Sequence, residues 1–380
     1  MYIFSSKIEI STECGLGGYG ITNASACKKG GSLEVHGFGF DDSLTTTSWE
    51  VCSIDTLYAG ELALHQIPNT PRRIFAASHT HYAPMLDKNK PSLGLYSEDT
   101  FQKFTTSIKT ATRKNISPDN CIVMRSEVLI PVYRRFDFPA SLFNRYLSKY
   151  AGAFPNDAHP VDKGVYLFLF RKGTDNLFCI VYHACHPVTR HDYCAVSADY
   201  VCAIREAVFQ RFGTPHCLFF LGCAGDIRPN FTKKRVQWLP KSRLNWRFRY
   251  PPTEEQQKSA DRQYRDAIGT ADALTSFKLT ELDFNCSSKN RSIEGRDEIT
   301  IYEIAVGRKL IFTFLPFEVS HRFHLASQRE EQAMKFIVSC SNDTIGYLPY
   351  PDQLSYGGYE VDGSRRDMGL QNRLLLKEIF

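Results

Sequence analysis

The 380-residue sequence lacks several features that would assign it to a class at once. No uninterrupted apolar run approaches the roughly 20 residues that a transmembrane helix needs. The N-terminus has no basic region followed by a long apolar stretch, so we expect no secretory signal peptide. The 46 basic and 41 acidic residues give a formal net charge of +5, too small to indicate a nucleic-acid partner.

Paired cysteine motifs are also missing. None of the 12 cysteines stands in a CxxC pair. Several, such as Cys179 and Cys217, lie inside apolar runs, where free cysteine behaves as a small hydrophobic residue. A chain of this length does not need disulfides for stability. Together with the missing signal peptide, this predicts reduced thiols and a cytoplasmic location, and it argues against zinc ligation by cysteine.

Strand-like apolar runs alternate with helix-like segments, which favours an α/β fold in which a layered mixed β-sheet is flanked by helices. Residues 165–170 and 177–182 flank a Gly-Thr-Asp-Asn turn and are expected to form a hairpin. Further strands are expected at 74–77, 217–221, 310–315 and 336–340. Helices are expected at 98–112 (capped by Ser97), 199–212 and 253–273.

Residues 233–252 form a basic and aromatic segment with seven basic side chains, no acidic ones and three prolines. It can be an irregular surface insertion, a lid that offers arginines to an anionic group, or a single-stranded nucleic-acid contact. Modest charge on one loop disfavours the last reading. The glycine-rich residues 15–20 fit GxGxxG, but the sequence after them is a poor helix. We therefore interpret them as a turn and not as a dinucleotide loop.

Two histidines, His79 and His81, directly follow the apolar run at 74–77. If that run is a strand, alternate side chains share a face, so both imidazoles can point into one site. Imidazole is the commonest protein ligand for zinc. Alone the pair is weak evidence, because such histidines more often lie on the surface or form ordinary hydrogen bonds.

Four further segments repeat this layout of an apolar run followed by residues that bind metals or do chemistry. They carry His183 and His186, Asp226 and Arg228, Glu318, and Tyr347. Sites in α/β sheets gather beyond the carboxyl ends of strands, so five such coincidences predict one shared metal site there. A mixed histidine and carboxylate set suits zinc with an open coordination position.

These segments resemble the neutral/alkaline (non-lysosomal) ceramidase family in its N-terminal zinc hydrolase domain. The matching pieces are residues 78–84, 186–199, 225–230, the glutamate after a Leu-Pro strand end, and 342–347 continuing to 358–360. They occur in family order. The resemblance implies that residues 1–380 form a single catalytic domain.

The family binds one zinc ion through two histidines, a glutamate and a tyrosine. Carried over by motif, the implied zinc ligands are His79, His186, Glu318 and Tyr347. Residues that match the lining of the family's catalytic centre are His81, Tyr359 and Arg134.

Some assignments keep alternatives. His183 is the rival of His186, but we favour a strand histidine satisfied in the core for His183. Asp199 and Asp226 are either cap and turn residues or acceptors for the N–H groups of ligand histidines.

Two departures from the family pattern stand out. The family's GD-x-SPN motif has a serine implicated in catalysis or in holding the ceramide head, and Arg228 stands there in this chain. A guanidinium can clamp a carboxylate or phosphate but suits a neutral lipid hydroxyl poorly. The chain ends at residue 380, so we expect no C-terminal immunoglobulin-like domain. The sequence thus predicts zinc hydrolase chemistry without ceramide specificity, with Arg228 binding an anionic group.

The leading hypothesis is a zinc-dependent hydrolase that uses metal-activated water to cleave an N-acyl amide in a small polar or anionic substrate. His81 or a nearby carboxylate would take the proton, and Tyr359 and Arg134 would face the developing oxyanion. The alternative is a non-hydrolytic, metal-containing relative that binds an acidic metabolite through Arg228. The sequence leaves open the choice between amide and ester, and the oligomeric state.

Overall fold

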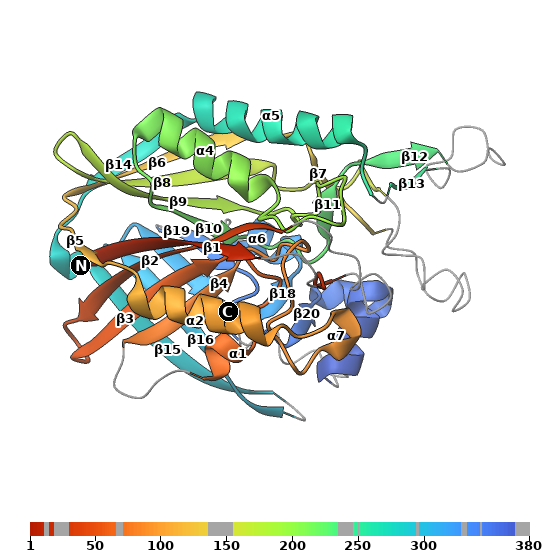
Figure 1. Ribbon diagram of the computed structural model, residues 1–380, viewed down its shortest axis with the longest axis horizontal. Helices are drawn as coiled ribbons and strands as arrows, with labels where there is room; N and C mark the ends of the chain where they lie inside the picture. Colours follow the sequence, from red (N-terminus) through yellow and green to blue (C-terminus); the bar gives the residue numbers. More distant parts are fainter. Residues whose placement is uncertain are drawn as a thin grey trace.

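Three β-sheets form the framework of the protein (Figure 1). The computed structural model describes residues 1–10, 15–18, 30–65, 71–135, 155–234, 246–249, 251–293, 296–327, 333–342 and 344–368. The first sheet has the strand order β4 (Arg72–Ala77), β3 (Thr47–Ile54), β2 (Gly31–Asp42), β1 (Tyr2–Ile10), β5 (Lys114–Asn115). The second has the order β10 (Cys217–Leu221), β9 (Asp175–His183), β8 (Gly164–Lys172), β6 (Asn120–Glu127), β14 (Asp272–Lys278). The third has the order β15 (Phe284–Ile293), β16 (Arg296–Val306), β17 (Leu310–Phe314), β19 (Met334–Val338).

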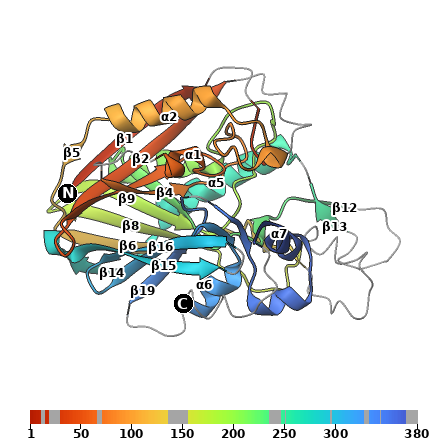
Figure 2. The same cartoon turned by 90° about the horizontal axis from the view of Figure 1, so that it is seen from below.

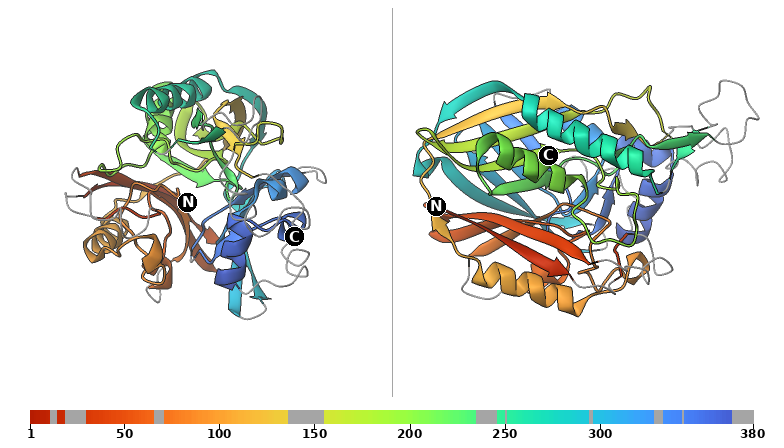
Figure 3. Two further views of the ribbon diagram at one scale, coloured as in Figure 1. Left: turned by 90° about the vertical axis from the view of Figure 1, so that its right-hand side faces the viewer. Right: turned by 45° about the horizontal axis from the view of Figure 1, so that its top comes forward.

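The three sheets meet at a shared aromatic core, and the left view of Figure 3 shows them as three parts around a common centre. Phe38 of β2 stacks on Phe178 of β9 with ring centroids 5.6 Å apart, and it meets Phe284 of β15 edge-on at 6.5 Å. Phe220 of β10 contacts Phe312 of β17 at 5.4 Å. Burial of these rings from all three sheets is a large apolar contribution to stability.

Helices cover the outer faces of two sheets. Helix α2 (Glu98–Thr110) lies along β1 and β2, as Figure 2 shows, and begins where the Ser97 side chain accepts a hydrogen bond from the Thr100 amide. Helices α4 (Tyr200–Phe212) and α5 (Glu254–Thr270) pack together over the second sheet (Figure 1). Thr253 and Gln256 form a reciprocal capping box at the start of α5.

Short elements complete the fold near the ends of the sheets. The helices are α1 (Glu61–Leu64), α6 (His321–Ser327) and α7 (Tyr359–Met368), with 3₁₀ turns η2 (Pro91–Leu93), η4 (Glu281–Asp283) and η5 (Pro351–Ser355). The strand pairs are β7 (Pro131–Tyr133) with β11 (Ile227–Pro229), β12 (Thr232–Lys234) with β13 (Trp246–Phe248), and β18 (Phe317–Val319) with β20 (Gly346–Leu348).

The predicted fold class is confirmed, as are the hairpin of β8 and β9 and the helices at α2, α4 and α5. The predicted layered sheet is in fact several sheets, because sequence patterns identify strands but not their pairing partners.

The ten cysteines among the described residues are all free. No helix in the described part of the chain is long and apolar enough to cross a membrane. Within the predicted 233–252 segment, residues 235–245 and 250 lie outside the described residues, as do residues 19 and 20 of the glycine-rich turn.

Candidate metal centre and active site

His79 enters the site through an unusual backbone conformation at the end of β4. Its φ is 63°, in the left-handed region that residues other than glycine seldom adopt. The backbone amide of His79 donates to the carbonyl of Thr56 at 2.9 Å, which holds this conformation. Nδ1 of the buried ring lies 2.9 Å from the Leu57 carbonyl oxygen. Strained backbone of this kind is concentrated at functional sites, where the surrounding structure enforces it.

His186 lies beyond the carboxyl end of β9 and reaches the same place. Its backbone amide and its Nδ1 both contact the Ile227 carbonyl oxygen, at 3.3 and 2.8 Å. The His79 and His186 ring centroids are 5.0 Å apart. The end of β9 and the first residue of β11 therefore fix both the position and the rotation of this ring.

Glu318 comes from β18 and faces both histidines. Its Oε2 lies 3.4 Å from Nε2 of His79 and 3.3 Å from Nε2 of His186. Parallel pairing of β18 with β20 sets Glu318 directly opposite Tyr347. Gly225 packs against this strand so closely that a Cβ atom there would lie 2.6 Å from the Glu318 carbonyl oxygen. The glycine of the Gly-Asp sequence at 225–226 is thus required by the approach of β18.

The chemistry of these donors fits a metal ion. A carbonyl oxygen can only accept, so Nδ1 of His79 and of His186 must carry a proton, and Nε2 of each ring is the atom left to bind a cation. Both Nε2 atoms face Glu318 Oε2, which accepts no hydrogen bond from the described residues. Acceptors that converge in a buried space need a cation or a proton between them.

His81 belongs to the same cluster. Ligand atoms of His79, His81 and His186 all lie within 4.8 Å of one another. The sequence predicted His81 as a proton-transfer residue and not as a ligand, and the distances alone are compatible with either role. Gly18, which has φ +84°, packs on the His81 ring, where a Cβ atom would lie 2.3 Å from Nδ1. The glycine-rich turn therefore serves the site by allowing this close approach.

Burial controls protonation in the cluster. It lowers the pKa of His81 well below the ordinary value, with His79 and His186 adding to the effect, and it lowers the pKa of His186 to about 4. Burial also raises the pKa of Glu318, but His79 and His186 outweigh it and hold that pKa well below the usual range. His81 and His186 are therefore neutral and Glu318 is ionised, as metal ligation requires. Burial also lowers the pKa of His79, but Cys340 and Glu318 outweigh it and hold that pKa well above the ordinary value, so a metal would have to displace a proton from His79.

A cavity of about 400 Å³ opens beside the cluster. It is lined by Gly18, Leu57, Tyr58, His79, His81, Asn89, Lys90, Ser92, Leu93, Glu318, Ile345, Gly346, Tyr347 and Tyr359. The volume is typical of a small-molecule site. Tyr347 and Tyr359 contact each other with ring centroids 5.5 Å apart, and Tyr359 remains 53% exposed at the mouth.

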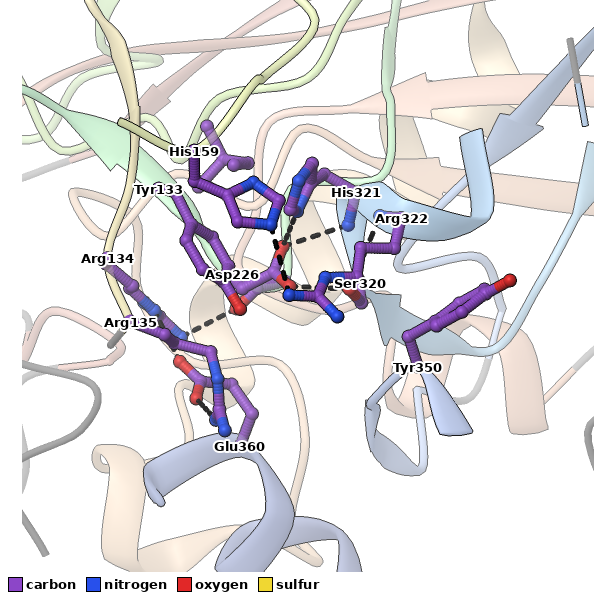
Figure 4. A network of polar contacts seen from close by, with 12 residues as sticks. Tyr133, Arg134, Arg135, His159, Asp226, Ser320, His321, Arg322, Tyr350 and Glu360 are labelled. Atoms are coloured by element: carbon purple, nitrogen blue, oxygen red, sulfur yellow. Dashed lines mark hydrogen bonds and ion pairs between the residues drawn. The ribbon is translucent and has the colours of Figure 1, made fainter. Parts of the chain in front are cut away.

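Arg134 contacts the rings of both Tyr347 and Tyr359. Its guanidinium carbon lies 5.7 Å from the Tyr347 ring centroid and 5.6 Å from that of Tyr359. Burial lowers the pKa of Arg134, but Glu360 and Tyr347 raise it well above the usual value, so the charge is permanent. Nε of Arg134 donates to Glu360 at 2.7 Å, and Arg135 donates to the other carboxylate oxygen (Figure 4). Glu360 lies in the first turn of α7, so its two arginine contacts fix this turn, which also carries Tyr359.

Glu360→Ala is expected to lower the free energy of unfolding by about 3 kcal/mol, because it leaves two buried guanidinium groups without their carboxylate. Denaturant titration measures this loss. The matched control is Glu206→Ala, which breaks an exposed pair with Arg265 and should change stability by less than about 0.5 kcal/mol. Equal effects of the two substitutions would show that Glu360 does not anchor α7.

Asp226 organises the other side of the site, where Figure 4 shows it between Tyr133, Ser320 and His321. Its carboxylate accepts from the Ser320 hydroxyl, from the backbone amide and Nδ1 of His321, and from Gln353. Burial raises the pKa of Asp226, but His321 and the hydrogen bonds hold it well below the usual range. Because Ser320 follows Glu318 by two residues, Asp226 anchors the strand that carries Glu318.

The idea that Asp199 or Asp226 accepts from ligand imidazoles is wrong. Backbone carbonyls of Leu57 and Ile227 take that role, and Asp199 caps α4 and accepts from Thr189. His183 is buried with Nδ1 2.8 Å from the Gly164 carbonyl oxygen and Nε2 3.2 Å from the Tyr264 hydroxyl. Its two nitrogens are thus engaged in the core, away from the cluster.

Arg228 lies in β11, and its guanidinium carbon is 4.5 Å from the Phe248 ring centroid. It does not appear among the described residues that line the cavity, although its charge contributes to the lowered pKa of His81. Its predicted contact with an anionic substrate group stays a prediction.

Tyr58 is a site residue that the sequence analysis missed. Its buried hydroxyl donates to Glu318 Oε1 at 2.6 Å, which orients the other carboxylate oxygen toward the histidines. No sequence signal marked it, because it follows β3 in a run of mostly apolar residues.

Tyr58→Phe is expected to weaken metal binding about 10- to 100-fold, the usual cost of losing a group that orients a metal ligand. Metal titration of the purified protein measures this, and the ring of phenylalanine preserves the packing. Unchanged affinity would mean that the Tyr58 hydroxyl does not orient Glu318 for binding.

The fold and the buried cluster together define an α/β protein with a candidate metal centre at the base of a small-molecule cavity. The structure is similar to the crystal structure of neutral ceramidase from Pseudomonas aeruginosa, with a TM-score of 0.63 and 13% sequence identity over 97% of this chain and 72% of that chain. It is also similar to a ceramidase complexed with C2, with a TM-score of 0.59 and 12% identity over 97% of this chain and 73% of that chain. The chain therefore has the ceramidase-like fold that its motifs predicted. No protein-family model matches the sequence, and no curated protein is detectably similar to it in sequence.

Proposed function

We propose that the protein is a metal-dependent amidohydrolase that cleaves an N-acyl bond in a small polar or anionic molecule. The observation that carries this is the convergence of Nε2 of His79 and Nε2 of His186, both on rings held by backbone carbonyls, on Oε2 of Glu318 beside a cavity. The ceramidase-like fold supports an amide as the bond, since the similar structures are named ceramidases.

His79, His186 and Glu318, with Tyr347 opposite Glu318, would hold the metal, and zinc suits this set of nitrogen and oxygen donors. When bound, zinc supplies Lewis-acid chemistry that acidifies water and polarises a carbonyl group.

The remaining side chains would divide the proton transfer and charge stabilisation. His81 is neutral and buried beside the cluster, so it can take a proton from the attacking water. Tyr359 lines the cavity and can donate to the oxyanion, while Arg134 holds Tyr359 and Tyr347 in place. Water adds to the acyl carbon, the carbon–nitrogen bond breaks, and the departing amine receives a proton.

The test is a screen of N-acyl amino acids and related amides with purified protein, chelated protein, and chelated protein resupplied with zinc. Hydrolysis that disappears with the chelator and returns with zinc supports the proposal. Zinc binding without hydrolysis of any amide or ester would instead favour the non-hydrolytic metabolite-binding protein that Arg228 suggests.

Fractionation of the source cells tests the proposed cytoplasmic location.

A further inference from the structure

Among the described residues that line the cavity, Lys90 is the one lysine, and none is an arginine. The other groups in the described lining that can carry a charge at neutral pH, Glu318 and His79, contact each other in the metal cluster, and Glu318 also binds His186 and Tyr58. Lys90 is therefore the cavity group with charge available to attract a substrate.

The Lys90 ammonium is held in a defined place. Nζ lies 3.2 Å from Oδ2 of Asp87, whose side chain is fully buried, and 5.3 Å from the Tyr58 ring centroid. The other Asp87 oxygen accepts from the Asn89 amide at 2.8 Å. An ammonium has three N–H donors, and a single carboxylate contact leaves capacity for a second acceptor. Because the Tyr58 hydroxyl binds Glu318, the contact with the Tyr58 ring places the Lys90 ammonium next to the candidate metal centre.

The segment that carries Lys90 is anchored to the turn that packs on His81. The Lys90 carbonyl accepts from the Leu93 amide at 3.0 Å, and the Leu93 carbonyl accepts from the Gly18 amide at 2.7 Å. Gly18 in turn packs on His81. A cation on a braced segment can bind a ligand without much loss of conformational entropy.

We infer that Lys90 binds a carboxylate of the substrate, so that the substrate class is N-acyl amino acids or similar acyl amides with one negative charge. This inference rests on the proposed function. A single ammonium that already shares one carboxylate suits a monoanion better than a doubly charged phosphate. It places the anion-binding group in the cavity at Lys90, whereas the sequence alone pointed to Arg228.

The experiment compares N-acylglycines with the matching N-acylglycine amides, which differ by the one charge. Wild-type protein should prefer the acid by about 10- to 100-fold in kcat/KM, the usual value of a charge-assisted hydrogen bond. Lys90→Met, which keeps the length of the side chain, should erase that preference mainly through KM and spare the neutral amide and the metal content.

Lys88→Met is the matched control. Lys88 lies two residues away and carries the same charge, but it is half exposed, contacts Tyr96 and is not part of the described cavity lining. Its substitution should leave the preference intact. Because Lys90→Met leaves Asp87 buried without its partner, the double variant Asp87→Asn/Lys90→Met is measured as well and should show the same lost preference.

Equilibrium binding of the same ligand pair to metal-free protein gives a readout without turnover. Wild-type protein that binds the acid more tightly, with the difference lost on Lys90→Met, supports the inference even if no hydrolysis is found and the proposed function fails. Zinc-dependent hydrolysis with no acid preference, or a preference lost in Arg228→Gln but kept in both Lys90 variants, overturns the inference and leaves the hydrolase intact.

Discussion

His186→Ala is expected to abolish stoichiometric metal binding. The substitution removes one of the two Nε2 atoms that face Glu318, on a ring that the Ile227 carbonyl holds in place. Loss of a ligand should weaken metal binding by more than the roughly 10- to 100-fold cost of losing a supporting hydrogen bond. Metal content after dialysis, measured per chain, tests this, and hydrolysis should fall with it.

His183→Gln is the control for this experiment, since His183 is three residues away and equally buried. It binds Gly164 and Tyr264 and not the cluster, so its substitution should lower stability but keep the metal. A variant at His183 that loses metal while His186→Ala retains it would reverse the assignment of the two histidines.

Tyr359→Phe is expected to lower kcat about 100-fold while metal content and KM change little. The hydroxyl would interact with charge that develops in the transition state, and one such donor typically contributes 10²- to 10³-fold. The half-exposed position of Tyr359 places the expected effect at the lower end of that range. Steady-state kinetics on the best substrate, with metal analysis of the same sample, measures it.

His81→Ala is measured together with Tyr359→Phe, because the geometry is compatible with either proton transfer or metal ligation by His81. As a proton-transfer residue it should leave metal bound and lower kcat. An unchanged kcat in Tyr359→Phe would remove Tyr359 from the reaction, and loss of metal in His81→Ala would make His81 a ligand.

Much of the site could be predicted because its residues follow strands. His79 and His186 stand just beyond β4 and β9, both recognisable as apolar runs, and polar residues at such strand ends are typical of sites. These two strands belong to different sheets, so the packing of the sheets brings the two histidines together. Motif resemblance then separated His186 from His183, which spacing alone could not do. The structure supplies the physical distinction, which is the carbonyl partner of each ring.

The parts that were missed depend on tertiary contacts without a local pattern. Tyr58 orients Glu318 across 260 positions of sequence, and Gly18 packs on His81 from a turn that resembled a cofactor loop only superficially. Lys90 and Lys88 lie in one polar loop, and no sequence pattern distinguishes Lys90, which lines the cavity, from Lys88, which is half exposed. Three separate sheets could not be foreseen either, because strand pairing is a long-range property.

Diffraction at the zinc absorption edge from crystals of the zinc-supplied protein tests the central claim most directly. The account predicts one anomalous peak per chain, within about 2.0–2.2 Å of Nε2 of His79, Nε2 of His186 and a Glu318 oxygen. A fully occupied peak elsewhere in the protein, or none between these three side chains at saturating zinc, would contradict it.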